Sequence, residues 1–92
     1  MRKITAEIKR AFDRRESKTI NNTRTDGQAV WLHGNKIIER RGKHIFATLA
    51  GWNTPTTRER LNGILNAGFH QKNFEAFLNN KPIDKKAWIK IN

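Results

Sequence analysis

The side chains most able to do chemistry in this sequence are cations. Lys and Arg together number 19 against eight Asp and Glu, which gives a formal net charge of +11 on 92 residues. A folded chain with this excess repels itself, so such a charge is typical of proteins that bind a polyanion. The cations are spread along the chain rather than gathered in one tail. We therefore predict that a folded body presents them.

Seven of these cations stand where a negatively charged partner could reach them. Two lie four residues apart, which is about 6 Å along a helix. Three surround a glycine in a predicted turn, and two lie at the beginning of a predicted helix, where backbone N–H groups also attract anions. Guanidinium groups can bind phosphate through two parallel hydrogen bonds. The predicted binding residues for nucleic acid or another partner are Arg10, Arg14, Arg40, Arg41, Lys43, Arg58 and Arg60. The alternative is a charged face that only keeps the protein in solution.

Patterns typical of catalysis or metal binding are weak in this sequence. The three histidines, His33, His44 and His70, have no HxxxH or HExxH spacing, and the chain has no Cys. No GxxxxGK[ST] phosphate loop is present, and the carboxylates stand close to Lys or Arg as partners for ion pairs. We therefore expect no enzyme, no catalytic residues, no metal site and no cofactor. A metal-dependent nuclease that uses His33 or Glu39 is the least favoured alternative.

The spacing of apolar residues predicts the elements that position the cations. Ile4, Ile8 and Phe12 fall on one face of a helix, which we expect over about residues 2–16. Four short runs rich in β-branched and apolar residues follow, with Asp26-Gly27 as a hairpin turn between the first two. These runs predict an antiparallel meander of about four strands. The expected strands lie at 18–25, 28–33, 36–40 and 44–49.

The segment GWNTPTTRERLN at 51–62 connects the last of these strands to a second predicted helix. Thr54 is suited to cap that helix, and Pro55 suits its first position because the missing N–H costs nothing there. We expect Gly68 to end the helix and Trp52 to pack beneath the preceding turn.

Alternating residues after the second helix predict a small β element at the C-terminus, with Pro82 on an edge strand. The predicted fold class is therefore α+β. It consists of an N-terminal helix, an antiparallel β-meander of about four strands, a second helix and a small C-terminal β element. A chain of this length predicts a single domain over residues 1–92.

Alternation within two predicted strands directs two aromatic side chains to a common face. If Val30 and Ala47 point toward the core, Trp31 and Phe46 point away from it. Bases stack on accessible aromatic rings, so Trp31 and Phe46 are candidate stacking residues for nucleic acid. Two alternatives remain open: the C-terminal strands cover this face, or the two rings are themselves the inward set.

Neither a membrane segment nor a secretion signal is expected from the sequence. No run of about 18 apolar residues is present. The first residues, MRKITAEIKRAF, lack the continuous apolar stretch of a signal peptide. We therefore expect a cytoplasmic protein.

Three segments, WLHGNKIIE, TLAGWNTPTTRERLNG and FLNNKPIDKKAWIKI, resemble a family of small phage-encoded proteins. The resemblance covers most of the chain from about Trp31 onward. It rests on a Leu-His-Gly-Asn turn and a Gly-Trp-x-x-x-Thr-Thr segment. The small size and high charge are also similar to those of phage anti-CRISPR proteins, in particular inhibitors of the type I-F surveillance complex.

The anti-CRISPR resemblance implies a stoichiometric inhibitor without catalysis in the cytoplasm of the bacterial host cell. Its partners would be the Cas proteins and crRNA of a CRISPR–Cas ribonucleoprotein complex, and it would block recognition of target DNA. The positive charge argues against mimicry of DNA, so Arg and Lys would contact RNA or an acidic protein surface directly. The alternative is a basic phage early protein that binds DNA or RNA itself.

Overall fold

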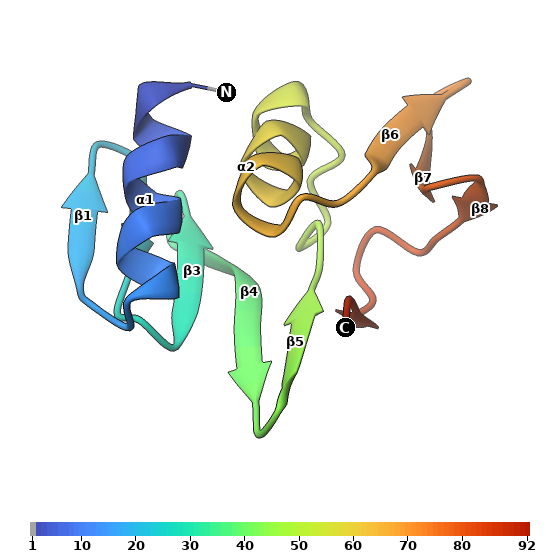
Figure 1. Cartoon of the computed structure of the whole chain (residues 1–92). Coiled ribbons are helices and arrows are strands. Elements are labelled where there is room, and N and C mark those ends of the chain that lie inside the picture. Colours follow the sequence, from blue (N-terminus) through green and yellow to red (C-terminus); the bar gives the residue numbers. More distant parts are fainter. Residues whose placement is uncertain (1) are drawn as a thin grey trace.

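Two helices and nine strands make up the fold in the computed structural model, which describes residues 2–92. The helices are α1 (Lys3–Asp13) and α2 (Pro55–Leu65). The strands are β1 (Lys18–Ile20), β2 (Thr23–Thr25), β3 (Ala29–Leu32), β4 (Asn35–Arg41), β5 (His44–Ala47), β6 (Phe69–Lys72), β7 (Glu75–Leu78), β8 (Lys81–Pro82) and β9 (Ile89–Lys90). This order confirms the predicted α+β fold and the predicted sequence of its parts (Figure 1).

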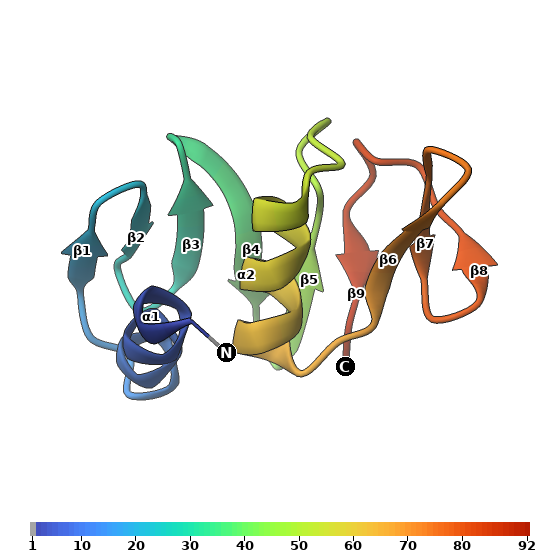
Figure 2. The same ribbon diagram turned by 90° about the horizontal axis from the view of Figure 1, so that it is seen from above.

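The strands form two antiparallel sheets. The larger has six strands in the order β1-β2-β3-β4-β5-β9, and the smaller has three in the order β6-β7-β8. Figure 2 shows the strands of the larger sheet side by side, with the smaller sheet beyond β9. Pro82 lies in β8, which pairs only with β7, so the predicted edge position is confirmed.

The meander contains five strands instead of the expected four. The run at 18–25 was expected to be one strand, but Asn21 adopts a left-handed conformation with φ 51°. The chain therefore reverses at this point, and Ile20 pairs with Thr23 across the resulting turn. Asn tolerates positive φ better than most residues, so a short polar pair is enough to divide the run.

Helix α1 ends at Asp13, three residues earlier than the expected end. Arg15 has φ 58°, and the N–H of Glu16 donates to the carbonyl of Ala11 at 2.8 Å. This is the Schellman arrangement that closes many helices. The backbone of Arg15 then passes Gly27 so closely that a Cβ at Gly27 would lie 2.4 Å from the Arg15 carbonyl carbon. Gly27 is thus required for its size as well as its positive φ.

One apolar core joins both helices to the larger sheet. Ile8 and Phe12 of α1 and Leu61 of α2 pack in one buried cluster with Val30 and Ala47 of the sheet. Both helices lie on the same side of the sheet (Figure 2). We call the side that they cover the inner face and the opposite side the outer face.

Helix α2 begins as predicted and ends differently. The Thr54 hydroxyl accepts the Thr57 N–H at 3.2 Å, and Pro55 is the first helical residue. The helix ends at Leu65 because Asn66, rather than Gly68, adopts the left-handed cap conformation. Gly68 instead allows a close contact, since a Cβ there would lie 2.4 Å from the Asn79 side-chain oxygen.

No helix among residues 2–92 is long and apolar enough to cross a membrane.

Candidate functional site

The outer face of the larger sheet carries aromatic rings that are covered by cations. In the strand register Trp31 is opposite Arg24 on β2 and opposite Lys36 on β4. The Arg24 guanidinium carbon lies 3.8 Å from the centre of the Trp31 ring, and the Lys36 ammonium lies 5.6 Å from it. Both distances fit cation–π contacts. Trp31 thus forms the centre of a cationic cluster on three neighbouring strands.

A second cluster of the same kind lies at the β5 side of the outer face. The Arg41 guanidinium carbon is 4.5 Å from the centre of the Phe46 ring and 5.0 Å from that of Trp88. Phe46 is also opposite Lys90 of β9 in the register. The three rings of the outer face, Trp31, Phe46 and Trp88, are half-buried rather than core residues.

Glu39 connects the two clusters. Its carboxylate lies 3.7 Å from the Lys36 ammonium and 3.3 Å from the Arg41 Nε. Exposed ion pairs of this kind contribute little stability. They can nevertheless restrict where the two cations lie. The outer-face array therefore has one carboxylate among its cations, and it consists of Arg24, Trp31, Lys36, Glu39, Arg41, Phe46, Trp88 and Lys90.

The placement of Trp31 and Phe46 away from the core is confirmed. Val30 and Ala47 are fully buried on the inner face, and their neighbours Trp31 and Phe46 point the other way. The C-terminal strands do not cover these rings, since β9 joins the edge of the sheet and β6–β8 form a separate one. Contact of either ring with nucleic acid stays a prediction.

Arg60 is the clearest correction to the predicted binding residues. The prediction that it meets a partner at the surface is wrong in its placement, because only 1% of the residue is exposed. Its Nε donates to the Thr23 hydroxyl at 3.0 Å, and its Nη1 donates to the Thr5 hydroxyl at 3.1 Å and to Glu59. Helix α2 turns this position toward α1 and β2. The guanidinium is therefore an internal cross-link.

Glu59 supplies the negative charge for this buried group. Its Oε1 accepts the hydroxyl hydrogen of Thr5 at 2.6 Å as well as the bond from Arg60. Burial opposes the charge of this carboxyl, but the hydrogen bonds from Thr5 and Arg60 outweigh it and hold the pKa of Glu59 below its usual value. The Glu59 carboxylate is thus charged at neutral pH and balances the guanidinium of Arg60.

Arg40 and Arg58 are also engaged by the fold itself. The Arg40 guanidinium donates to the carbonyls of Phe12 at 2.7 Å and Gly27 at 3.1 Å, and lies 4.0 Å from the centre of the Phe12 ring. Partial burial and the nearby charge of Arg15 lower the pKa of Arg40. The Nη1 of Arg58 donates to the carbonyl and side-chain oxygens of Asn53 at 3.0 and 2.6 Å. Both residues are therefore tied to neighbouring loops.

The remaining four predicted cations are exposed but are not all brought together. Arg10 and Arg14 belong to the last turn and cap of α1, on the side of the sheet that the helices cover. Arg41 lies on the outer face, and Lys43 is in the tight turn that follows it. Of the seven predicted cations, only Arg41 therefore contacts the rings of the outer-face array.

Four members of the outer-face array were missed by the sequence patterns: Arg24, Lys36, Trp88 and Lys90. Arg24 is flanked by two buried threonines, so alternation in that short run could have directed it outward. Lys36 and Lys90 reach the rings only through cross-strand register, which no local pattern reveals. Trp88 follows a turn and lies outside any strand.

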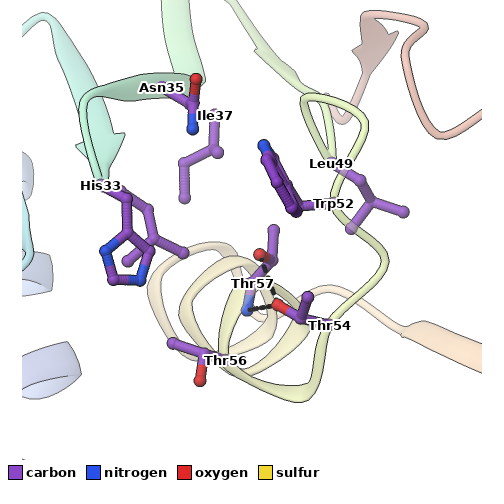
Figure 3. Close-up of a pocket in the computed structure, with 9 residues that line it drawn as sticks. His33, Asn35, Ile37, Leu49, Trp52, Thr54, Thr56 and Thr57 are labelled. Carbon is purple, nitrogen blue, oxygen red and sulfur yellow. Dashed lines mark hydrogen bonds between the residues drawn. The ribbon is translucent and has the colours of Figure 1, made fainter.

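A pocket of about 470 Å³ lies at the other side of the β3–β4 turn, beside the beginning of α2 (Figure 3). Leu32, Ile37 and Leu49 form its apolar wall, and Trp52 closes one side. The expectation that Trp52 packs beneath the turn is wrong, since 58% of the residue is exposed. The tight turn that precedes Trp52 directs the indole outward, and the backbone N–H of Trp52 donates to the Leu49 carbonyl at 2.8 Å.

The sequence profile of a family described as Kyanoviridae Gp96 protein matches residues 1–92. The chain belongs to this family. It is therefore a small phage protein, as the resemblance of its segments implied. No curated protein and no solved structure matches the chain. The family description names no activity and no partner.

Proposed function

We propose that this phage protein binds single-stranded nucleic acid with the outer-face array. One observation carries the proposal: three aromatic rings remain half-exposed on one sheet face, and a cation contacts or pairs with each of them. Proteins that bind single strands combine aromatic stacking surfaces with cations that follow the backbone. A core residue would bury its ring, and a purely solubilising surface would not need aromatic rings.

The cation–π contacts do not block this use of the rings. A base can stack on a guanidinium plane as well as on an aromatic ring. Arg24 lies over Trp31, and Arg41 lies between Phe46 and Trp88, so each guanidinium offers a flat surface next to a ring. The same guanidinium groups can turn toward phosphate, which they bind more strongly than a neutral acceptor.

The proposal is tested by fluorescence anisotropy with a labelled single-stranded oligonucleotide. Arg24→Gln/Arg41→Gln removes two charges from the outer face, and Arg10→Gln/Arg14→Gln removes two from the helix side. We expect the outer-face pair to weaken binding about 100-fold or more, because each of the two lost hydrogen bonds to a charged group contributes roughly 1.5 kcal/mol or more. The helix pair should have a much smaller effect. Equal losses in both variants would mean that binding follows net charge alone, and the proposal would then be wrong.

A second candidate function is inhibition of a CRISPR–Cas complex in the host cytoplasm. Membership of a phage family favours this candidate, because a phage protein acts in a host cell. The single strand that it binds would then be the crRNA of a host CRISPR–Cas complex. The outer-face array would contact accessible crRNA or an acidic surface of the Cas proteins and stop target DNA from pairing. Affinity capture from infected cells, with and without nuclease, separates the two candidates. Protein partners that survive nuclease support the inhibitor, and loss of all partners supports direct binding of nucleic acid.

A further inference from the structure

We propose that the pocket beside Trp52 receives a single unstacked base of the strand that lies on the outer face. This inference rests on the proposed function and adds to it a second contact of different chemistry. The pocket has a volume of about 470 Å³, which falls in the usual range of small-ligand pockets. A base is the part of a nucleic acid that can enter an apolar pocket, since its ring is flat and uncharged.

The Trp52 indole is the first reason for a planar ligand. More than half of this residue is exposed, although burying an aromatic ring of this size is the more favourable outcome. Ala50 and Gly51 have φ of 54° and 84°, so a tight turn with two left-handed residues holds the indole at the pocket. Figure 3 shows the ring edge-on, with one face turned toward Ile37 and His33.

Polar side chains around the pocket are the second reason. Among the side chains that line it in the described part of the chain, a hydrogen bond joins only those of Thr54 and Thr57, whose hydroxyls are 2.9 Å apart (Figure 3). The side chains of His33, Asn35 and Thr56 make no hydrogen bond within residues 2–92. An amide, a hydroxyl and an imidazole can together donate to and accept from the edge of a base. An apolar side chain from a protein partner would leave these groups without a role.

The continuity of the pocket with the outer face is the third reason. His33 and Gly34 form the turn between β3 and β4. Just before and after it, Trp31 and Lys36 lie on the outer face, while their neighbours Leu32 and Asn35 line the pocket. A strand that crosses Trp31 and Lys36 therefore needs only to pass this turn to place its next base beside Trp52.

The inference can be tested with the three Trp indole N–H signals of the ¹⁵N-labelled full chain. The Trp52 signal is assigned by its loss in Trp52→Phe. We expect millimolar AMP to shift the Trp52 signal, and ribose 5-phosphate, which lacks a base, to leave it unchanged. The inference would be overturned if AMP did not shift the Trp52 signal, or if ribose 5-phosphate shifted it by the same amount.

Oligonucleotide binding by Trp52→Ala provides the second measurement. We expect a loss of about 5- to 150-fold, which corresponds to one base–aromatic stack, with no change in salt dependence because no cation is removed. Phe74→Ala is the matched control, since Phe74 is 91% exposed and lies outside both sites. Its affinity should equal that of the wild type. Asn35→Ala, which keeps the indole, should weaken AMP binding as well.

The outcomes separate this inference from the proposed function. If Trp52→Ala binds the oligonucleotide normally while Arg24→Gln/Arg41→Gln does not, the pocket inference fails and the proposed function stands. If neither variant loses affinity, the proposed function fails, and the pocket inference fails with it. Loss of a protein partner by Trp52→Ala, with normal oligonucleotide binding, would assign the pocket to a protein and also overturn the inference.

Discussion

A single buried guanidinium joins three elements of this fold. Arg60 of α2 donates to Thr5 of α1 and Thr23 of β2, and Glu59 next to it balances the charge. No buried side-chain polar atom in the described part of the chain is left without a hydrogen-bond partner. Burying a charge costs several kcal/mol unless it is paired in this way, so the network forms only when all of its members are in place.

Replacing Arg60 tests its structural role. We expect Arg60→Ala to lower the free energy of unfolding by about 3 kcal/mol, because one partner of a buried pair remains without its counterion. Urea denaturation measures this change. Arg10→Ala is the control, since an exposed cation outside such a network should change stability by less than about 0.5 kcal/mol. An equally small effect of Arg60→Ala would contradict the structural role.

At the scale of elements, local turn chemistry decides where each strand ends. Asp26 is an example, since its carboxylate accepts the N–H groups of Gln28 at 2.8 Å and Ala29 at 2.9 Å, which lowers the pKa of Asp26. Such signals allowed the sequence to predict the hairpins and the start of α2. The extra strand and the early end of α1 were missed, because Asn21 and Arg15 adopt positive φ although neither residue is a glycine, the usual sequence signal for that conformation.

The β6–β7 hairpin contains a turn residue that does not suit its conformation. Asn73 and Phe74 both have positive φ, 52° and 65°, in the two-residue connection. Turns of this type favour glycine at such positions, and a residue with a Cβ costs roughly 1–2 kcal/mol there. The Phe74 ring is almost fully exposed and does not offset this cost by packing.

We expect Phe74→Gly to raise the free energy of unfolding by about 1 kcal/mol, since it removes the unfavourable Cβ. Thermal denaturation followed by circular dichroism provides the measurement. Phe74→Ala is the matched variant, because it removes the ring and keeps the Cβ, and it should show little of the gain. If alanine stabilises as much as glycine, backbone conformation is not the cause.

At the scale of the whole molecule, the fold distributes its cations over distinct roles. Some are used internally, as Arg60 and Arg40 are, and others lie on the helix side, as Arg10 and Arg14 do. The outer face keeps four cations and one carboxylate. The net charge of +11 therefore overstates the charge that any one bound strand would meet.

The salt dependence of binding measures how many cations act together. If four cations of the outer face contact phosphate, the logarithm of affinity should fall with the logarithm of salt with a slope of about −3, since each phosphate neutralised on a single strand contributes roughly −0.7. Affinity would then drop about 50-fold between 50 and 200 mM salt. A slope near −8 would indicate that a number of cations equal to the whole net charge of +11 contacts phosphate. A slope near zero would exclude an electrostatic site.

The structure decided that Trp31 and Phe46 point outward, while the sequence by itself determined the helices, most of the hairpins and the common face of these two rings. Each of these follows from periodicity or from a turn within a few residues, so neighbouring residues are sufficient to decide them. Only the tertiary structure decided which cations meet those rings and which are buried. Arg24 and Lys36 reach Trp31 through cross-strand register, and Arg60 reaches Thr5 from 55 positions away. Such contacts depend on packing between distant segments, and packing is a property of the folded chain as a whole.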